Sequence, residues 1–282
     1  MGIRSLIQKL KGAGRSGRTN PLAAPPTLSG ATRFPYGPFR FKTRLGKGNA
    51  YIIEASTDFK TWTPVSKGIS SAEEFEYVDS DASKFGHRFY RVLAGELLSN
   101  NVIGYAAVAL PPGFSMIGNP LVSPENTVGK LFKDWPEGTS LNKFDTRLFR
   151  LAENTVKAKQ WTNPSERLMP GEGAIFFNPT SDYKSHSFVG EVAQGQLSIP
   201  IPAGFSVRSS LVPLPGSLEE LGFPITNGDV IHLFDRDRQK YVLHPYEDDK
   251  WQAGPPVVSV GEAFWVAKTE PGNWTRNLRI AG

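Results

Sequence analysis

The stretch PPGFSMIGNPL at residues 111–121 returns at residues 202–212 as PAGFSVRSSLV. Further blocks return in the same order and at nearly the same distance: KLFKDWPEGTSLNKFD (130–145) as ELGFPITNGDVIHLFD (220–235), Trp161 as Trp251, and PGEGAIFF (170–177) as VGEAFWVA (260–267). Chance rarely keeps order, spacing and residue type together, so this part of the chain is predicted to be one unit of about 90 residues used twice. We place the two copies at residues 106–199 and 200–282.

Each copy contains short segments rich in β-branched and aromatic residues, separated by Gly and Pro turns. A strand is expected after each Pro-x-Gly-Phe-Ser, and a short helical turn at VGKLF (128–132) and at SLEELGF (217–223), where Ser217 and Glu220 predict a capping box. The other expected strands are SLNKFD and DVIHLF, RLFRLA and KYVLHP, GAIFFN and EAFWVAK, and the closing segments SFVGEV (187–192) and NWTRNLRIA (273–281). This pattern predicts an all-β fold of antiparallel sandwich or barrel modules.

Residues 34–105 form a separate block with the same character. Apolar and polar residues alternate in it with a period of two, which is typical of half-buried strands. The expected strands are 39–45, 50–57, 73–79 and 87–93. GKGN (46–49) predicts a hairpin turn between the first two, because a phosphate-binding glycine loop would be followed by a helix.

The segments YIIEASTDFKTWTPV (51–65) and DSDASKFGHRFYRV (79–92) resemble a short β module, loosely fibronectin type III-like, that is frequent in large exported bacterial proteins. Its recurring positions are filled here by Glu54, Ser56, Asp58, Trp62 and the strand Phe89-Tyr90-Arg91. The resemblance implies a packing and spacing module without catalytic residues. Trp62 is then expected in the core or as a plug at a strand end.

The duplicated region resembles repeats of uncharacterised exported or surface proteins of environmental bacteria, most specifically in FVGEVAQGQLSIPIPAGFSVRSSLVP (188–213). The resemblance implies a β-rich, non-enzymatic role in a surface structure or an assembly. Such relatives usually carry an export signal, whereas the pattern of a secretory signal is not found in this sequence. We therefore expect a protein made in the cytoplasm that ends in an assembled particle, such as a phage virion, or in a cell-surface structure.

The formal net charge of +5, from 32 Lys and Arg against 27 Asp and Glu, arises within the first 30 residues. Apolar residues at helical spacing lie among these cations, so residues 1–33 are predicted to hold a short basic amphipathic helix and then a linker at 19–33. Burial of four apolar side chains does not offset the cost of ordering the segment, so the helix should form only on a partner. Expected partners are the protein subunits of a multimeric assembly or an anionic surface of nucleic acid or lipid headgroups. The candidate docking residues are Ile3, Arg4, Leu6, Ile7, Lys9, Leu10, Lys11, Arg15 and Arg18. A mobile terminus that only adds solubility is the alternative interpretation of this segment.

Most catalytic and metal chemistry is disfavoured by the residues present. Cysteine is absent and the four histidines are scattered, so no metal and no cofactor is predicted. Ser115 and Ser206 are repeated, but no histidine is repeated with them. Asp235 and Asp237 have calcium-loop spacing without the Gly and the Glu that such a loop requires. Asp145 and Asp235 end matching strands, where Asx turns are the simpler explanation.

The repeated Trp161 and Trp251, with Glu172 and Glu262, are the candidate ligand platform, because aromatic rings can stack on a glycan. Core packing of the rings and turn-bracing by the carboxylates are the competing, simpler interpretation. We expect a non-catalytic structural subunit. Glycan or host-surface binding is the alternative, and a hydrolase with paired carboxylates is a third, weaker hypothesis.

Overall fold

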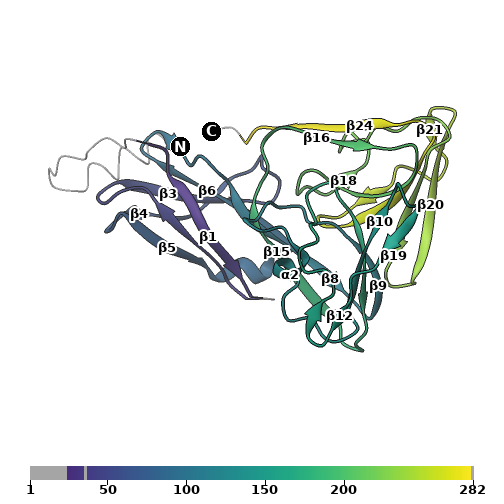
Figure 1. Cartoon of the computed structure of the whole chain (residues 1–282). Coiled ribbons are helices and arrows are strands. Elements are labelled where there is room, and N and C mark those ends of the chain that lie inside the picture. Colours follow the sequence, from purple (N-terminus) through teal and green to yellow (C-terminus); the bar gives the residue numbers. More distant parts are fainter. Residues whose placement is uncertain (1–23, 35–36, 281–282) are drawn as a thin grey trace. The chain divides into compact units, whose positions relative to one another are not determined.

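The computed structural model describes residues 24–34 and 37–280, and nearly all regular structure in this part of the chain is β-strand (Figure 1). Helices there are limited to η1 (Ser80–Lys84), a 3-10 turn, and α2 (Val128–Leu131), and neither is long or apolar enough to cross a membrane. The prediction of an all-β fold is confirmed. The candidate docking arm lies outside the described residues, with Ile3, Arg4, Leu6, Ile7, Lys9, Leu10, Lys11, Arg15 and Arg18.

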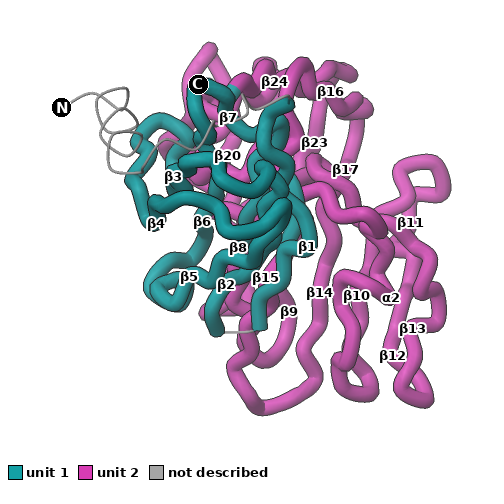
Figure 2. Tube along the Cα trace, turned by 90° about the vertical axis from the view of Figure 1, so that its left-hand side faces the viewer, with its two compact units in different colours: residues 1–105, 189–191, 280–282 teal, residues 106–188, 192–279 magenta. Residues whose placement is uncertain are grey.

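The chain divides into two compact units (Figure 2). Unit 1 comprises residues 1–105, 189–191 and 280–282, and unit 2 comprises residues 106–188 and 192–279. The change of unit falls within β8 (Ile103–Leu110) and within β15 (Lys184–Glu191).

Unit 1 contains two sheets that enclose a common core, which makes it a β-sandwich. The first sheet has the order β1-β2-β5, formed by β1 (Thr27–Arg33), β2 (Phe39–Arg44) and β5 (Glu74–Asp79). The second has the order β15-β8-β6-β3-β4, with β7 also paired to β6; its other members are β3 (Ala50–Ser56), β4 (Thr63–Ile69), β6 (His87–Ala94) and β7 (Leu97–Leu98).

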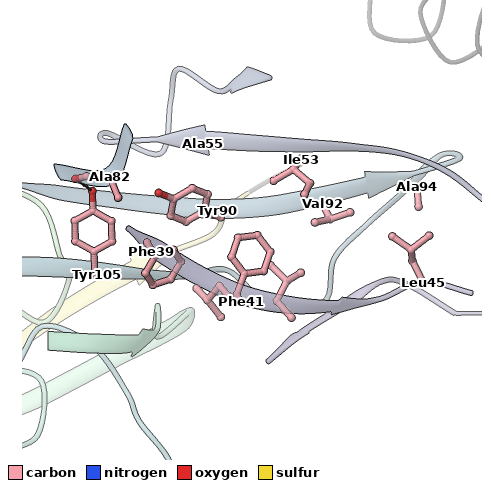
Figure 3. Close-up of a cluster of buried hydrophobic side chains, with 12 residues drawn as sticks. Phe39, Phe41, Leu45, Ile53, Ala55, Ala82, Tyr90, Val92, Ala94 and Tyr105 are labelled. Atoms are coloured by element: carbon pink, nitrogen blue, oxygen red, sulfur yellow. Dashed lines mark hydrogen bonds between the residues drawn. The ribbon is translucent and has the colours of Figure 1, made fainter. Parts of the chain in front are cut away.

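The core of unit 1 is rich in aromatic rings. Phe39 and Phe41 on β2 point toward Tyr90 on β6, and the centroids of Phe39 and Tyr90 are 4.9 Å apart in a stacked arrangement (Figure 3). Tyr105 lies beside them and donates its hydroxyl to the Ala82 carbonyl at 2.6 Å. The period-2 pattern of β2 therefore has the predicted effect, because it turns the rings inward and the cations between them outward.

Two expectations for this unit are wrong. Residues 27–33, expected as part of a linker, form β1, because their backbone pairs with β2 and their Leu28 enters the core at 1% exposure. The turn at 46–49 does not close a hairpin, because β2 pairs with β1 and β5 whereas β3 pairs with β4 and β6. Both strands bury their apolar faces in one core, so the turn carries the chain from one sheet of the sandwich to the other.

The residues Glu54, Ser56, Asp58, Trp62 and Arg91 all make structural contacts. Buried Glu54 accepts a hydrogen bond from Arg91 Nε at 2.8 Å, and the Arg91 guanidinium lies 4.2 Å from the Trp62 ring centroid. The Ser56 hydroxyl donates to Asp58 Oδ1 at 2.9 Å and so shapes the turn that follows β3. Trp62 directly precedes β4 and is half-buried, so it closes a strand end.

Unit 2 contains two sheets with the same strand order, one from each sequence repeat. The sheet of repeat 1, ordered β11-β10-β14-β9, is made of β9 (Gly113–Ile117), β10 (Ser140–Asp145), β11 (Arg150–Ala152) and β14 (Ala174–Asn178). The sheet of repeat 2, ordered β17-β23-β19-β20-β21, is made of β17 (Gly204–Ser209), β19 (Val230–Asp235), β20 (Lys240–Glu247), β21 (Lys250–Trp251) and β23 (Ala263–Lys268). Starting from the same end, the order is β9-β14-β10-β11 in repeat 1 and β17-β23-β19-β20 in repeat 2, where β21 is an additional strand. The register also agrees, since Leu141↔Phe176 corresponds to Ile231↔Val266. The duplication is therefore present in the fold.

Each repeat also has a leading strand beside its closing strand. β8 neighbours β15 in repeat 1, and β16 (Gly195–Ile201) pairs along its length with β24 (Gly272–Leu278) in repeat 2 (Figure 1). The expected boundary between residues 199 and 200 falls inside β16, whose pairing places it with repeat 2. Two shorter pairs join β12 (Val156–Lys157) to β13 (Gln160–Trp161) and β18 (Gly216–Ser217) to β22 (Val257–Val258).

The two expected helical turns have different outcomes. α2 forms at 128–131, as predicted. SLEELGF forms a hydrogen-bonded turn and no helix, because Gly222, with φ of 66°, ends it after one turn. The capping box is nevertheless made, since Ser217 N–H donates to Glu220 Oε2 at 2.9 Å and Glu220 N–H donates to Ser217 Oγ at 3.2 Å.

Candidate binding site

Trp161 is buried in the core of repeat 1. It is 8% exposed, and its Nε1 donates a hydrogen bond to the Phe132 carbonyl at 2.9 Å. The two rings meet edge to face, with centroids 6.3 Å apart. No ring face of Trp161 is left for a sugar, so the platform hypothesis is wrong for this residue and the packing interpretation is right.

Trp251 lies on the last strand of the repeat 2 sheet and is half-buried. Its Nε1 donates to Glu219 Oε1 at 2.8 Å, and its ring meets Tyr246 with centroids 5.1 Å apart. Trp251 packs on the core of repeat 2, whereas Trp161 belongs to the core of repeat 1. The two tryptophans therefore do not converge on one site.

Glu172 and Glu262 brace matching turns. Each accepts, at 2.8 Å, a hydrogen bond from the backbone N–H three residues before it. Each also faces a cation, with Lys143 Nζ 2.9 Å from Glu172 and Arg236 Nη2 3.7 Å from Glu262. Both carboxylates thus stabilise the loop before a strand, as the simpler interpretation holds.

Asp145 and Asp235 form the predicted Asx turns. Each accepts hydrogen bonds from the backbone N–H groups two and three residues further on, at 2.8–3.0 Å. These N–H groups hold the pKa of Asp145 below its usual value. Within the described residues, no group of three or more His, Asp or Glu is placed to hold a metal ion.

The two repeats of unit 2 contact each other reciprocally. Gly118 N–H donates to Gly261 O at 3.0 Å, and the matching Ser209 N–H donates to Gly171 O at 3.1 Å. Contacts in which each partner uses the same surface are characteristic of a two-fold interface. Around them lies a shared cluster, made of side chains on the sheet faces turned away from each repeat's own core: Met116 and Val207, Phe144 and Phe234, Ile175 and Trp265.

A hollow of about 290 Å³ opens beside the shared cluster, and we call it the aromatic hollow. Adjacent rings in it stand edge to face, with centroids 4.8 Å apart for Phe144 and Trp265 and 6.2 Å apart for Phe149 and Phe205. Repeat 1 supplies Phe144 and Phe149, and four strands of the repeat 2 sheet supply Phe205, His232, Tyr241 and Trp265.

The aromatic hollow is electrically neutral near pH 7. Burial lowers the pKa of His232 and raises that of Tyr241, so neither ring is charged. Trp265 Nε1 donates a hydrogen bond to the Tyr241 hydroxyl at 3.1 Å, so the hydroxyl oxygen is the acceptor and its own proton remains on it. No carboxylate is among the described residues that line the hollow. Such a site can hold an apolar or planar group by packing, and it lacks the acid and base of a hydrolytic centre.

The residues that are identical in the two repeats do not predict the aromatic hollow. Only the phenylalanines at 144 and 205 have phenylalanine at the matching position of the other copy. The lining differs elsewhere, where Phe149 corresponds to Gln239 and Trp265 corresponds to Ile175. The signal that could have found the site is an aromatic residue on the outer sheet face in one copy only.

No family model matches this sequence, and the search of curated proteins gives no match. Among solved structures, the chain is similar to one described as "Crystal structure of tetra-tandem repeat in extending region of large adhesion protein". The TM-score is 0.25 with 10% sequence identity, over 94% of this chain and 76% of that chain. A TM-score of this size is below that of a shared fold, so the likeness carries no information about function.

Proposed function

We propose that this protein is a non-catalytic structural and interaction subunit of a larger assembly. The observation that supports a non-catalytic role is that the repeated carboxylates accept hydrogen bonds from the backbone of their own loops. Glu172 and Glu262 brace turns, and Asp145 and Asp235 bind their own loops. A glycosidase-like centre would instead need two free carboxyl groups about 5–10 Å apart across an open cleft.

The accessible surface beside the hollow supports contact with a protein. The tip of the β10–β11 hairpin exposes Leu148 at 60% and Phe149 at 66%, next to the ring-lined hollow. Several large apolar side chains that are exposed close together, as at this hairpin tip and hollow, are typical of interaction sites. Arg147 and Arg150 flank the same tip, and arginine is enriched at such sites.

The proposal also names the kind of assembly. The resemblance of residues 51–92 and 188–213 to modules of exported bacterial proteins favours a phage virion-like particle or a bacterial surface structure. The basic arm at residues 1–18 would dock the chain on neighbouring subunits or on an anionic surface. Several copies would then turn weak contacts into a stable assembly through avidity.

Sedimentation velocity over a range of concentrations, with negative-stain imaging of the full chain, tests the proposal. We expect concentration-dependent larger species that are reduced by deletion of residues 1–18 and by the double change Leu148→Ser/Phe149→Ser. Val257→Ser is the matched control, because Val257 is 62% exposed and does not line the hollow. A chain that stays monomeric and captures no partner subunit would contradict the proposal.

Glycan binding is the second candidate, because exposed rings line the hollow. It would use Phe205 and Trp265 in place of Trp161 and Trp251. A glycan array with Phe205→Ala and Trp265→Ala tests it, and equal binding by these variants and the unchanged protein would exclude it.

A further inference from the structure

Gln239 closes the open edge of β9. β9 is the last strand of its sheet, and its outer side forms an isolated bridge between Ile117 and Glu262, whereas the N–H and C=O of Phe114 on that side have no strand partner. At Phe114 the side-chain amide of Gln239 takes that place. Phe114 N–H donates to Gln239 Oε1 at 2.8 Å, and Gln239 Nε2 donates to Phe114 O at 2.9 Å. One planar carboxamide therefore satisfies both backbone groups.

Phe205 occupies the matching position on β17, which is also the last strand of its sheet. The strand register is the same, since Phe205↔Ala267 corresponds to Phe114↔Phe177. In an antiparallel pair, successive residues point their backbone groups alternately toward and away from the partner strand. The N–H and C=O of Phe205 are thus expected to point outward, as those of Phe114 do.

Two contacts further along β17 support this alternation. Val207 O accepts a hydrogen bond from Arg208 Nη1 at 2.9 Å, and Ser209 N–H donates to Gly171 O at 3.1 Å. The odd-numbered residues of β17 therefore turn away from β23. Within the described part of the chain, no side chain provides Phe205 with the contact that Gln239 provides at Phe114.

Phe149 stands where Gln239 stands in the other repeat. The two residues have nearly the same left-handed φ, 50° and 52°, so their side chains leave matching backbones. Phe149 has no polar side-chain group, and its ring lies 6.2 Å from that of Phe205. A Cβ at Gly113 would come within 2.8 Å of Gln239 Oε1, whereas one at the matching Gly204 would meet nothing within 4 Å. The space that the amide fills in one repeat is open in the other.

We propose that the edge of β17 at Phe205, together with the aromatic hollow, recognises an extended segment of a partner protein that presents a Gln or Asn side chain. The carboxamide oxygen accepts from Phe205 N–H, and its nitrogen donates to Phe205 C=O. A neighbouring apolar side chain of the segment enters the hollow. This inference rests on the proposed function, because it names the partner chemistry of the same surface.

Among single functional groups, a primary carboxamide fits this geometry. This group has an N–H and the C=O on the same side of one plane, so it can pair with both groups of Phe205. A single trans peptide group points its N–H and C=O in opposite directions, so it can pair with only one of the two groups of Phe205. Backbone pairing with both would need the two peptide groups that flank one strand residue. A carboxylate has no donor and would leave Phe205 C=O unpaired. The precedent within the chain is a glutamine side chain at a hairpin tip, which favours a protein source.

Amide chemical shifts of the full chain labelled with ¹⁵N-phenylalanine test the inference. The first probe is 3-phenylpropanamide, which joins a carboxamide to a ring, and its control is the acid 3-phenylpropanoate. The second is the peptide acetyl-Gly-Gln-Leu-Gly-methylamide, with glutamate replacing glutamine as its control. Each carboxamide is expected to shift the Phe205 resonance and to bind at least about tenfold more tightly than its acid.

Two variants test whether the edge at Phe205 is the site that binds the probes. Phe149→Gln should supply its own carboxamide to Phe205, so the probe-dependent shift at Phe205 is lost. Gln239→Ala should open the edge of β9, so a new probe-dependent shift arises at Phe114. The other phenylalanine resonances report whether each variant is folded.

The outcomes are separable. A Phe205 resonance that ignores the carboxamides, or that responds equally to amide and acid, overturns the inference. Persistence of the Phe205 shift in folded Phe149→Gln also overturns it. A chain that assembles in the sedimentation experiment without binding the probes refutes the site alone, whereas a chain that binds them but stays monomeric and captures no partner subunit refutes the assembly alone.

Discussion

Asp229 and Lys268 form a buried ion pair in repeat 2, and the change Asp229→Asn is expected to destabilise unit 2 strongly. The two side chains are 0% and 1% exposed, and Lys268 Nζ also donates to Pro224 O at 2.7 Å and to Thr226 Oγ1 at 2.9 Å. Burial acts to raise the pKa of Asp229. Hydrogen bonds from Lys268, Thr269 and Thr226 outweigh burial and hold the pKa below its usual value.

The expected magnitude follows from the charge that is left behind. Removal of one member of a buried pair leaves the other desolvated and costs about 3–5 kcal/mol. For a unit of this size, 1 kcal/mol lowers Tm by about 2–4 °C, so the Tm of unit 2 should fall by about 6–20 °C. Repeat 1 supplies the control, because Thr139 and Asn178 occupy the matching positions and are buried. The double variant Asp229→Thr/Lys268→Asn removes both charges and should recover at least half of the loss.

Thermal melts followed by tryptophan fluorescence measure the effect, since five of the six tryptophans lie in unit 2. Folding lowers the pKa of Asp229 from 3.8, so the stabilisation by its charge is present above about pH 4 and lost as the pH falls below it. The difference between Asp229→Asn and the unchanged protein should therefore narrow in acid. A melt of Asp229→Asn within about 2 °C of the unchanged protein, or a double variant as unstable as the single one, would refute the reasoning.

Three further changes test other features of unit 2. A Cβ at Gly118 would lie 2.2 Å from Ser209 Cβ, so Gly118→Ser should cost about 1–3 kcal/mol in urea unfolding, and Ser209→Gly in the same chain should restore part of the loss. Burial lowers the pKa of His186 from 6.5 to about 3, so stability should fall by about 1.4 kcal/mol per pH unit as the pH drops from about 6.5 toward 3. His186→Phe should remove this contribution, so the slope between about pH 6.5 and 4 flattens, and an unchanged slope in that range would disprove its origin. Trp161→Phe leaves the Phe132 carbonyl unpaired and should cost about 1–3 kcal/mol, a loss that a ligand-stacking role would not produce.

The sequence predicts much of the fold because its strand patterns are local and the repeat doubles the signal. The strands of unit 2 follow the matched blocks, and the Asx turns at Asp145 and Asp235 form from short-range chemistry. β1 was not predicted, because TLSGATR has no clear alternation and becomes a strand only through pairing with β2. The hairpin predicted at 46–49 is wrong for a related reason. The same turn sequence can join two strands of one sheet or strands of two different sheets, and the outcome depends on strands that are distant in sequence.

The candidate site was less predictable than the fold. Residues that are identical in the two repeats, such as Trp161 and Glu172, stabilise the structure of each copy. A search for identical residues therefore finds structural positions. The hollow depends on positions where the repeats differ, above all Phe149 and Trp265. Those differences acquire meaning only when the reciprocal contact at Gly118 and Ser209 brings the two sheets together.

The reciprocal contact has a consequence for how such a chain can originate and be divided. A fragment holding one repeat would present Met116, Phe144 and Ile175 to water, and a second fragment of the same kind would offer the complementary surface. Such halves should associate in pairs when expressed apart. The full chain then corresponds to a symmetric dimer whose subunits have been fused into one polypeptide, which leaves each half free to acquire residues that the other lacks.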